Sequence, residues 1–373
     1  MSTFPSAATE PPSTERSGGV RVAEVWPQVA AIVAFIALVV IGLYWVKWHP
    51  YYHKGFATAT KHSLGASIVS GHSATAPSGW SAALDFAYKY TLSIWPALTV
   101  GLLLGAGIQE LLPRDWLRRV LGQSRWQSTA IAGVAAVPSM MCTCCSAPPA
   151  VGLARARASI GATIAYWVGN PVLNPATMVF MGLVLGWRWV GLRILVGLPL
   201  VFGAAAAVEH LFGRKVAVTD DVGTVVEETT PAAGATSGAT IFARWLRAAA
   251  RLAITLIPEY AIVVLALGAV RAFLFPTMSH SIGGAAWLVV LLAITGTLFV
   301  IPTAGEIPII AVLLGFGLSA AGAGALMITL PAVSLPSLVM VGRAVPARVL
   351  VFVGGSVVVA GLVTAGLAAA FGL

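Results

Sequence analysis

In the middle of a long apolar segment stands the stretch Val137-Pro138-Ser139-Met140-Met141-Cys142-Thr143-Cys144-Cys145-Ser146-Ala147-Pro148-Pro149. Prolines flank its centre on both sides. Because proline lacks a backbone N–H and clashes with the preceding turn, a regular helix cannot pass through this stretch unbroken. Broken backbone at membrane depth is tolerated only where protein buries it or where it lines a cavity. The stretch therefore predicts an interrupted membrane segment whose break lies inside the protein.

The same stretch contains all 3 cysteines of the chain, Cys142, Cys144 and Cys145, and Met140 and Met141 stand just before them. Thiolates and thioethers are soft ligands that suit Cu(I), Zn(II), As(III) and similar thiophilic species. Cysteine can also serve as a small buried apolar residue, which would explain a single membrane cysteine. Three cysteines in four residues favour a substrate or metal site made by the three thiols, with Met141 beside them.

The composition indicates a polytopic helical membrane protein. The chain is 58% hydrophobic and 9% charged, and apolar segments of 18 or more residues recur along it. The net charge of +9 does not indicate nucleic acid, because the Lys and Arg residues lie between apolar segments and set topology. No phosphate-binding Gly-x-x-x-x-Gly-Lys-[Ser/Thr] loop occurs, so we expect no nucleotide cofactor. The expected partners are the lipid bilayer and a small thiophilic substrate, and the oligomeric state stays open.

The chain divides into five parts. Residues 1–25 are rich in Ser, Thr, Pro and Glu and are expected to be disordered. Residues 26–85 are expected to hold a first span and a His-bearing extracytoplasmic loop. Two transmembrane repeats are expected at 86–212 and 250–373, joined by a polar cytoplasmic linker at 213–249.

Histidines gather after the first span, which is expected at residues 26–46 and ends in an aromatic interfacial cluster. His49 and His53 have the i,i+4 spacing that places two ligands on one helical face. They could capture a metal ion outside the membrane, or they could be ordinary polar residues of a loop. The spacing alone does not decide between these two explanations.

The two halves carry proline landmarks in the same order. The landmarks are Pro96, Pro138 and Pro171 in the first half and Pro258, Pro302 and Pro331 in the second, at offsets of 160 to 164 residues. Such a constant offset predicts an internal duplication.

The distribution of positive charge favours one topology. If every apolar segment is a single span and the N-terminus is cytoplasmic, the 22 Lys and Arg residues divide evenly between the two sides. If residues 127–154 and 286–317 are re-entrant hairpins, about two thirds lie on the cytoplasmic side, as the positive-inside rule requires. The expected fold is therefore all-α and polytopic, with one extra N-terminal span before two inverted repeats. Each repeat has three spans plus a broken hairpin, an arrangement that recurs in transporters.

Two intramembrane carboxylates are candidates for proton coupling. Glu259 follows Pro258, and Glu306 lies between Pro302 and Pro308 in the second broken segment. An ionisable residue inside the membrane is expensive and is by default a functional candidate. The alternative is a structural hydrogen bond to backbone groups that the prolines leave free.

Two asparagines each precede a proline. Pro171 and Pro175 remove the helical hydrogen bonds to the carbonyls of Trp167 and Pro171. If the helix continues, Asn170 and Asn174 lie one turn apart on one face and present their amides to a substrate. Alternatively, the asparagines only repair the kink.

Two motifs resemble those of the YraQ/ArsP-type predicted permease family. They are Cys142-x-Cys144-x-x-x-Pro148, followed by Gly152, and Gly169-Asn170-Pro171-Val172-Leu173-Asn174-Pro175. The family carries a Cys-Ser-Cys-x-x-x-Pro element in a membrane segment. The resemblance covers residues 86–373 and leaves out the first span and the His-bearing loop. It implies a permease, and the best-described members are similar in activity to efflux permeases for trivalent organoarsenicals.

These features predict a multi-pass permease of the bacterial inner membrane, and not an enzyme. It would move an organoarsenical or a soft metal ion through a site made by Cys142, Cys144 and Cys145. Proton coupling is expected because metal binding to thiols releases protons. The alternative is a membrane thiol–disulfide oxidoreductase that uses Cys142 and Cys145 as a Cys-x-x-Cys pair, although no second cysteine pair exists to pass electrons on. A scaffold role is disfavoured by the intramembrane carboxylates, and the direction of transport stays open.

Overall fold

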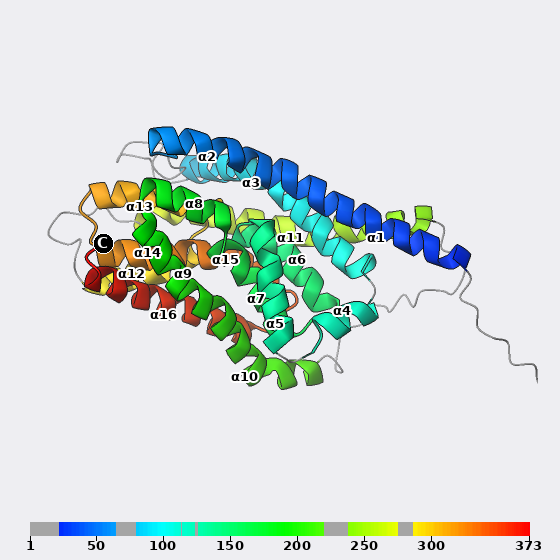
Figure 1. The fold of residues 1–373 in the computed structure, drawn as a ribbon. Coiled ribbons are helices and arrows are strands. Elements are labelled where there is room, and N and C mark those ends of the chain that lie inside the picture. The colour runs from blue at the N-terminus through cyan, green and yellow to red at the C-terminus, as the bar shows by residue number, and fades with distance from the viewer. Residues whose placement is uncertain (1–21, 65–79, 113, 124–125, 220–237, 275–285) are drawn as a thin grey trace, which may run out of the picture.

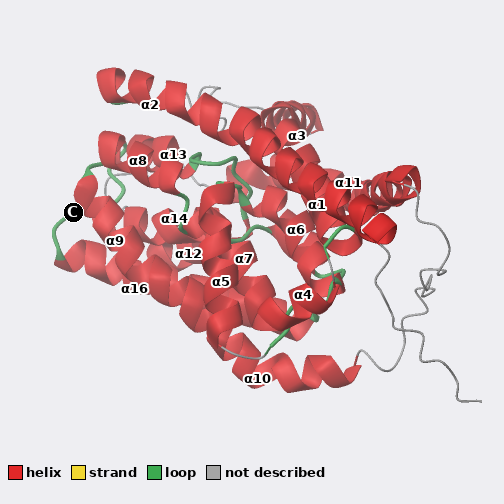
Figure 2. Cartoon of the chain, turned by 45° about the vertical axis from the view of Figure 1, so that its right-hand side comes forward, coloured by secondary structure: helices red, strands yellow, loops and turns green. Residues whose placement is uncertain are grey.

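The computed structural model describes residues 22–64, 80–112, 114–123, 126–219, 238–274 and 286–373. All regular structure in these ranges is helical (Figure 2). Six helical segments of the described chain are long and apolar enough to cross a membrane, which confirms the predicted all-α membrane class. Most of the segment expected to be disordered, residues 1–21, lies outside the described residues, as does the middle of the predicted linker, residues 220–237.

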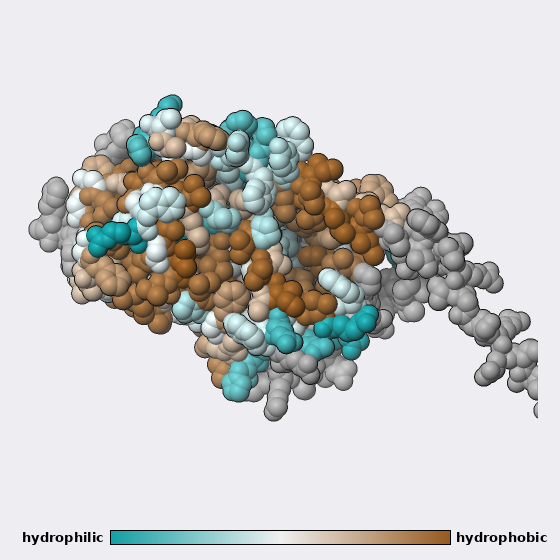
Figure 3. Space-filling view, in the orientation of Figure 1, coloured by the Kyte–Doolittle hydropathy of each residue, from teal (hydrophilic) through white to brown (hydrophobic). Residues whose placement is uncertain are grey.

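The outer surface has the character that a lipid environment requires. Large apolar side chains such as Ile254, Ile262 and Val351 are more than 60% exposed. Figure 3 shows a visible face that is largely hydrophobic, with hydrophilic side chains at its upper edge and at its lower edge over α4 (Arg114–Val120) and α10 (Ala204–Thr219). Because lipid tails are apolar, exposed apolar side chains cost little there, and polar groups gather at the edges.

The described chain begins as one continuous helical rod. Helix α1 (Val22–Leu43), the π-helical turn η1 (Tyr44–Trp48) and α2 (His49–Lys61) follow one another without a loop (Figure 1). Pro50 explains the wider turn, since it cannot donate the helical hydrogen bond to the carbonyl of Val46. The first span therefore does not end at residue 46. His49 and His53, expected in a loop, lie on α2.

The segment predicted to be the first repeat has four helical parts. They are the long helix α3 (Trp80–Glu110); a hairpin of α5 (Trp126–Ala136), the 3-10 turn η2 (Val137–Ser139) and α6 (Thr143–Arg155); an interrupted helix of α7 (Ile160–Val172) and α8 (Pro175–Val184); and a final helix of α9 (Trp187–Leu198), the π turn η3 (Pro199–Gly203) and α10. The short helix α4 joins α3 to the hairpin.

The second repeat has the same four parts in the same order. They are α11 (Gly238–Leu274); a hairpin of α12 (Ala286–Leu298) and α13 (Glu306–Gly315); an interrupted helix of α14 (Ala320–Ala332) and α15 (Leu335–Val341); and α16 (Ala347–Ala370). In Figure 1, α5 and α6 lie toward the right of the bundle, whereas α12 and α13 lie toward the left. The inverted orientation of the two repeats stays a prediction.

Two segments expected to be single unbroken spans are interrupted. The segment 160–185 breaks at residues 173–174, between α7 and α8, and the segment 323–341 breaks at residues 333–334, between α14 and α15. Each break is followed within two residues by a proline, Pro175 or Pro336, at the start of the next helix. Proline is favoured at this position because its missing N–H would have no intrahelical partner there.

Glycines let the cysteine-bearing half-helix lie directly against α3. A Cβ atom on Gly101 would collide with the carbonyl oxygen of Cys145, and one on Gly105 would collide with that of Pro148. On α6, Gly152 faces Gly105 in return. Small residues allow such close backbone approach between membrane helices, where van der Waals packing drives association. The half-helix α6 is therefore fixed against α3 through its backbone.

Candidate functional site

The two hairpin breaks have the same backbone conformation at equivalent positions. In the first break, Met140 has φ 48° and lies two residues after Pro138; in the second, Ala304 has φ 66° and lies two residues after Pro302. A side chain in this left-handed region costs roughly 1–2 kcal/mol. Such strain persists only where the surrounding packing holds it, and it is concentrated at functional sites.

The breaks meet in the centre of the protein. Tyr90 on α3 is fully buried, and its hydroxyl donates to the carbonyl of Ile301 at 3.2 Å and lies 3.7 Å from Cys144 Sγ. Thr143 Oγ1, at the start of α6, lies 2.9 Å from Ser334 Oγ, at the break between α14 and α15. Both hairpins and the second interrupted helix thus share one buried site.

The three cysteines divide into a pair and a separate thiol. Cys142 Sγ and Cys145 Sγ are 3.1 Å apart, whereas Cys144 Sγ is 3.6 Å from Ser334 Oγ and faces Tyr90. All three are buried and free. Within the described residues, no group of three Cys, His, Asp or Glu side chains could hold a metal ion. The structure therefore brings Cys142 and Cys145 together but does not gather the three thiols as one ligand set.

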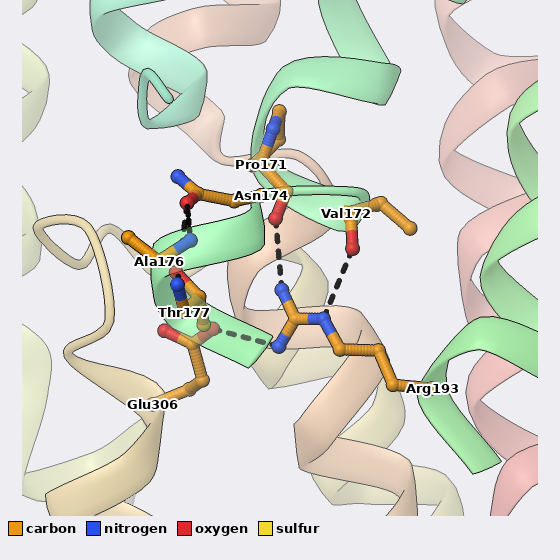
Figure 4. Close-up of polar contacts among 7 residues, drawn as sticks. All are labelled: Pro171, Val172, Asn174, Ala176, Thr177, Arg193 and Glu306. Atoms are coloured by element: carbon orange, nitrogen blue, oxygen red, sulfur yellow. Dashed lines mark hydrogen bonds and ion pairs between the residues drawn. The ribbon is translucent and has the colours of Figure 1, made fainter. Parts of the chain in front are cut away.

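The asparagines do not share a helical face, because α7 ends at Val172. Asn170 Oδ1 accepts a hydrogen bond from the backbone N–H of Met141 at 3.4 Å, and its Nδ2 donates to the carbonyl of Tyr166. Asn174 Oδ1 caps α8 by accepting from the N–H groups of Ala176 and Thr177 (Figure 4). One asparagine thus supports the first hairpin break, and the other begins α8, which corrects the expected arrangement.

The two carbonyls expected to lose their helical hydrogen bonds have side-chain donors instead. The carbonyl of Trp167 accepts from the hydroxyl of Ser146 at 3.3 Å. The carbonyl of Pro171 accepts from Arg193 at 2.8 Å. The carbonyls are therefore not open to a substrate in this conformation. They join α7 to the cysteine-bearing α6 and to α9.

Arg193 is the functional residue that the sequence analysis missed. It lies on α9 with 0% exposure, and its guanidinium forms an ion pair with Glu306 at 2.9 Å. It also donates from Nε to the carbonyl of Val172 at 3.0 Å, beside its bond to Pro171 (Figure 4). No role was predicted for Arg193 from the sequence. Its position inside an apolar segment, five residues after Arg188, was the signal that could have found it.

Glu306 begins α13 directly after the second break and is 1% exposed. A carboxylate in the first turn of a helix is stabilised by the positive end of the helix dipole. Oε1 pairs with Arg193, while Oε2 has no hydrogen-bond partner among the described residues. Glu306 also lines a small gap of about 10 Å³ with Cys142, Met141 and Asn174. The candidate carboxylate therefore has one oxygen with a partner and one without, and it lines the same gap as Cys142.

Glu259 lies in a different environment. It pairs with Arg343, which follows α15, and its side chain is 21% exposed. No partner for this carboxylate was predicted, so the ion pair with Arg343 is a correction. Glu259 does not line the gap that contains Cys142 and Glu306. The structure thus separates the two carboxylates expected to act together.

Four helix N-termini converge on the site. Helices α6, α8, α13 and α15 begin at or just after Cys142, Asn174, Glu306 and Ser334. Three of these residues line the small gap, and Ser334 contacts α6 through Thr143. A helix N-terminus carries a partial positive charge that favours an anion. Broken transporter helices use the same feature to bind anionic substrate groups.

The N-terminal rod reaches both hairpin breaks through its π turn. Lys47 Nζ donates to Thr303 Oγ1 at 3.1 Å, and Trp48 Nε1 donates to the carbonyl of Pro138 at 3.1 Å. Lys47 is buried, although the sequence placed it in an interfacial cluster. His49 and His53 do lie on one helical face, with ring centres 4.6 Å apart, but no third metal ligand joins them within the described residues.

Comparison with known proteins identifies the family. The profile of a predicted permease family (ArsP_1) matches residues 27–150 and 132–370. The chain belongs to this permease family. It is 46% identical over 337 residues to UPF0718 protein YraQ of Escherichia coli (strain K12), and the alignment covers 90% of this chain and 94% of the relative. No solved structure matches. The predicted family is thus confirmed, and the protein is a multi-pass membrane protein of a transporter family.

The family match also corrects the extent of the resemblance. The sequence analysis left the first span outside the family, yet the match begins at residue 27. The rod formed by α1, η1 and α2 is therefore part of the permease. The rod contacts both hairpin breaks, at Pro138 and at Thr303, which is consistent with its being part of the permease. The candidate site consists of the Cys142–Cys145 pair, the Arg193–Glu306 ion pair and Lys47.

Proposed function

We propose that this permease moves a thiophilic species, an organoarsenical or a soft metal ion, across the bacterial inner membrane. The substrate binds Cys142 and Cys145. The observation that carries the proposal is the 3.1 Å separation of these two sulfur atoms at a buried meeting point of broken helices. The N-terminus of the rod is cytoplasmic in this proposal, as the positive-inside rule favours.

Two neighbouring thiols match the bonding of a monosubstituted trivalent arsenical. Such a compound, R–As(OH)₂, keeps its As–C bond and exchanges two hydroxyl groups for two thiols, and two water molecules leave. The product has two As–S bonds and one As–C bond, so a third thiol is not required. Cys144 then does not bind the arsenic atom, and its thiol contacts Tyr90 and Ser334 instead. A soft ion such as Cu(I) also accepts two thiolates, and the transport assay below separates the two substrates.

Glu306 is the better placed of the two proton-coupling candidates. It lines the same gap as Cys142, and its Oε2 is free among the described contacts. In the proposed cycle, Arg193 releases Glu306 as the site opens, and the free carboxyl takes up a proton. The same movement frees Arg193 from the carbonyls of Pro171 and Val172, so it couples protonation to the break between α7 and α8.

The assay is growth and accumulation in a strain that lacks the permease. Cells with wild type, Cys142→Ser, Cys145→Ser or an empty vector are challenged with trivalent phenylarsenicals, Cu(I) and Zn(II). For efflux, the wild type lowers accumulation of one substrate and restores growth, and the two serine variants behave like the empty vector. For uptake, the wild type raises accumulation. Equal accumulation in all four strains for every compound would contradict the proposal.

A thiol–disulfide oxidoreductase is the second candidate, because Cys142 and Cys145 are close. A disulfide has an S–S distance of about 2.05 Å, so a movement of about 1 Å would join the two sulfurs. Oxidation would transfer two electrons to an external acceptor, since the chain has no second cysteine pair. Acid quenching of native membranes traps the thiols in their oxidation state, and mass spectrometry of the protein then distinguishes the two candidate functions. A cycling Cys142–Cys145 disulfide favours this candidate, whereas permanently reduced thiols favour transport.

A further inference from the structure

A cavity of about 360 Å³ lies between the N-terminal rod, α3 and the second hairpin break. Its described lining includes Lys47, Lys54 and Tyr90, and no Asp or Glu is among these residues. Residues 301–304 form a wall that this cavity shares with the small gap containing Cys142. The cavity therefore adjoins the gap that Cys142 lines, across this wall, and the charged groups of its described lining are all positive.

Lys47 is a buried ammonium group without a carboxylate partner. Its side chain is 5% exposed, and its contacts include the Thr303 hydroxyl at 3.1 Å and the Tyr51 ring at 5.6 Å. Lys47 also interacts electrostatically with the thiols of Cys142 and Cys145. No Asp or Glu of the described chain forms an ion pair with it. A buried charge is strongly disfavoured unless an opposite charge accompanies it. The cavity beside Lys47 thus favours an anion.

The rod continues this positive charge along one face. Lys47, Lys54 and Lys61 follow at intervals of seven residues, and such residues drift by only about 20° around a helix. Lys54 and Lys61 are exposed, whereas Lys47 is buried. The three residues form a row of positive charge from the end of α2 to the cavity. Clefts lined by one sign of charge raise the local concentration of the opposite ion.

We infer that the cavity is an anion-binding vestibule and that the transported substrate carries a negatively charged group. Lys47 and Lys54 hold this group while the soft atom of the substrate reaches Cys142 and Cys145, a destination that rests on the proposed function. The volume suits a small molecule of this kind. Carboxylated or sulfonated thiophiles, such as a carboxyphenyl arsenical or a metalloid bound to an acidic thiol, fit this description better than their neutral counterparts.

The experiment uses two thiol reagents of similar size and opposite charge. Purified full-length protein reacts with 2-sulfonatoethyl methanethiosulfonate or with 2-(trimethylammonio)ethyl methanethiosulfonate, and mass spectrometry gives the rate of labelling at Cys142 and Cys145. Each rate is divided by the rate for free 2-mercaptoethanol. We expect the wild type to favour the anionic reagent by about tenfold or more. The preference should fall toward unity in Lys47→Met, fall partly in Lys54→Met, and persist in Lys47→Arg.

Lys89→Met is the matched control, because Lys89 is an exposed lysine that pairs with Asp85 outside the cavity lining. Its reagent preference should equal that of the wild type. If Lys47→Met does not fold, the exposed Lys54→Met still provides the test. A preference for the cationic reagent, a preference unchanged by both lysine substitutions, or no labelling by either reagent would overturn the inference.

The labelling experiment tests the vestibule, and the transport assay tests the proposed function, so either claim can be contradicted without the other. If Cys142→Ser abolishes transport but the reagent preference does not depend on the lysines, only the vestibule is wrong. If the preference depends on Lys47 but the cysteine variants transport normally, the proposed function is wrong and the vestibule stands. A transport comparison of 4-carboxyphenylarsine oxide with phenylarsine oxide then shows whether the charge preference extends to substrates.

Discussion

The two hairpins have the same backbone conformation at their breaks but carry different side chains there. In each, a proline is followed two residues later by a residue with positive φ, Met140 or Ala304. The first break carries sulfur and is surrounded by the hydroxyl groups of Tyr90 and Ser334. The second break leads into Glu306, which is bound by an arginine. The two breaks thus have the same backbone conformation and different side chains, as the predicted duplication followed by divergence would produce.

The positively charged groups at the site come from outside the two hairpins that they contact. Lys47 comes from the N-terminal rod and reaches the second break at Thr303. Arg193 comes from the last helix of the first repeat and pairs with Glu306 of the second. The hairpin breaks form the backbone of the site, and segments elsewhere in the chain contribute its positive charge. If the comparison is correct, changes at the two breaks should have different kinds of effect.

The largest effect is expected for Arg193→Met. It leaves the carboxylate of Glu306 buried without its partner, which costs about 3–5 kcal/mol when one member of a buried pair is removed. The variant should unfold at a markedly lower temperature in detergent. The double variant Arg193→Met with Glu306→Gln should recover much of the loss, because no unpaired charge remains. Equal stability of wild type and single variant would show that the pair does not hold the second break.

The next effect concerns the first break and distinguishes its three thiols. Cys142→Ser and Cys145→Ser should each weaken binding of a trivalent phenylarsenical by at least about tenfold, a change of about 1.4 kcal/mol. Cys144→Ser should change it less, because Cys144 faces Ser334 and Tyr90. Titration of purified protein with the arsenical gives the three affinities. Equal losses of affinity at all three positions would instead support a site made by all three thiols.

A further effect concerns proton coupling at the second break. Glu306→Gln keeps the size of the side chain but cannot exchange a proton. It should reduce substrate-dependent proton flux in proteoliposomes to background. Glu259→Gln should reduce the flux less, since Glu259 is partly exposed, pairs with Arg343 and lies outside the gap. If only the Glu259 variant loses flux, the assignment of the two carboxylates must be reversed.

The smallest effect tests the shared backbone design. Met140→Gly should be more stable than Met140→Ala, and Ala304→Gly more stable than the wild type, each by up to about 1 kcal/mol, because glycine adopts positive φ without strain. Comparison of melting temperatures in detergent measures both differences. Met140→Ala is the reference for Met140→Gly, since it removes the buried side chain but keeps the strain. A lower stability of the glycine variant in both comparisons would mean that the left-handed positions are not strained.

The hairpin breaks could be predicted because proline acts locally. Pro138 and Pro302 interrupt apolar segments, and the regular offset between the halves predicted two equivalent breaks. The breaks at residues 173–174 and 333–334 had a local signal that was misinterpreted. Asn174-Pro175 is a typical helix start, with an N-cap residue followed by proline at the first helical position.

The charged partners could not be predicted from local pattern. Arg193 and Glu306 lie 113 residues apart in sequence, and Lys47 lies 256 residues from Thr303. Such pairs depend on how the helices pack, and the apolar pattern of a membrane helix does not show which face is buried against protein. The separation of Cys144 from the Cys142–Cys145 pair could not be predicted either. It depends on where α6 begins and on a contact with Ser334, which lies far away in the sequence.

The most direct test of the central claim is the number of sulfur atoms bound to the substrate. Arsenic X-ray absorption of the purified permease with a bound trivalent phenylarsenical counts them. We predict two sulfur ligands in the wild type and in Cys144→Ser, and one in Cys142→Ser and in Cys145→Ser. An arsenic atom without sulfur ligands, or with two sulfur ligands in every variant, would contradict a substrate site made by Cys142 and Cys145.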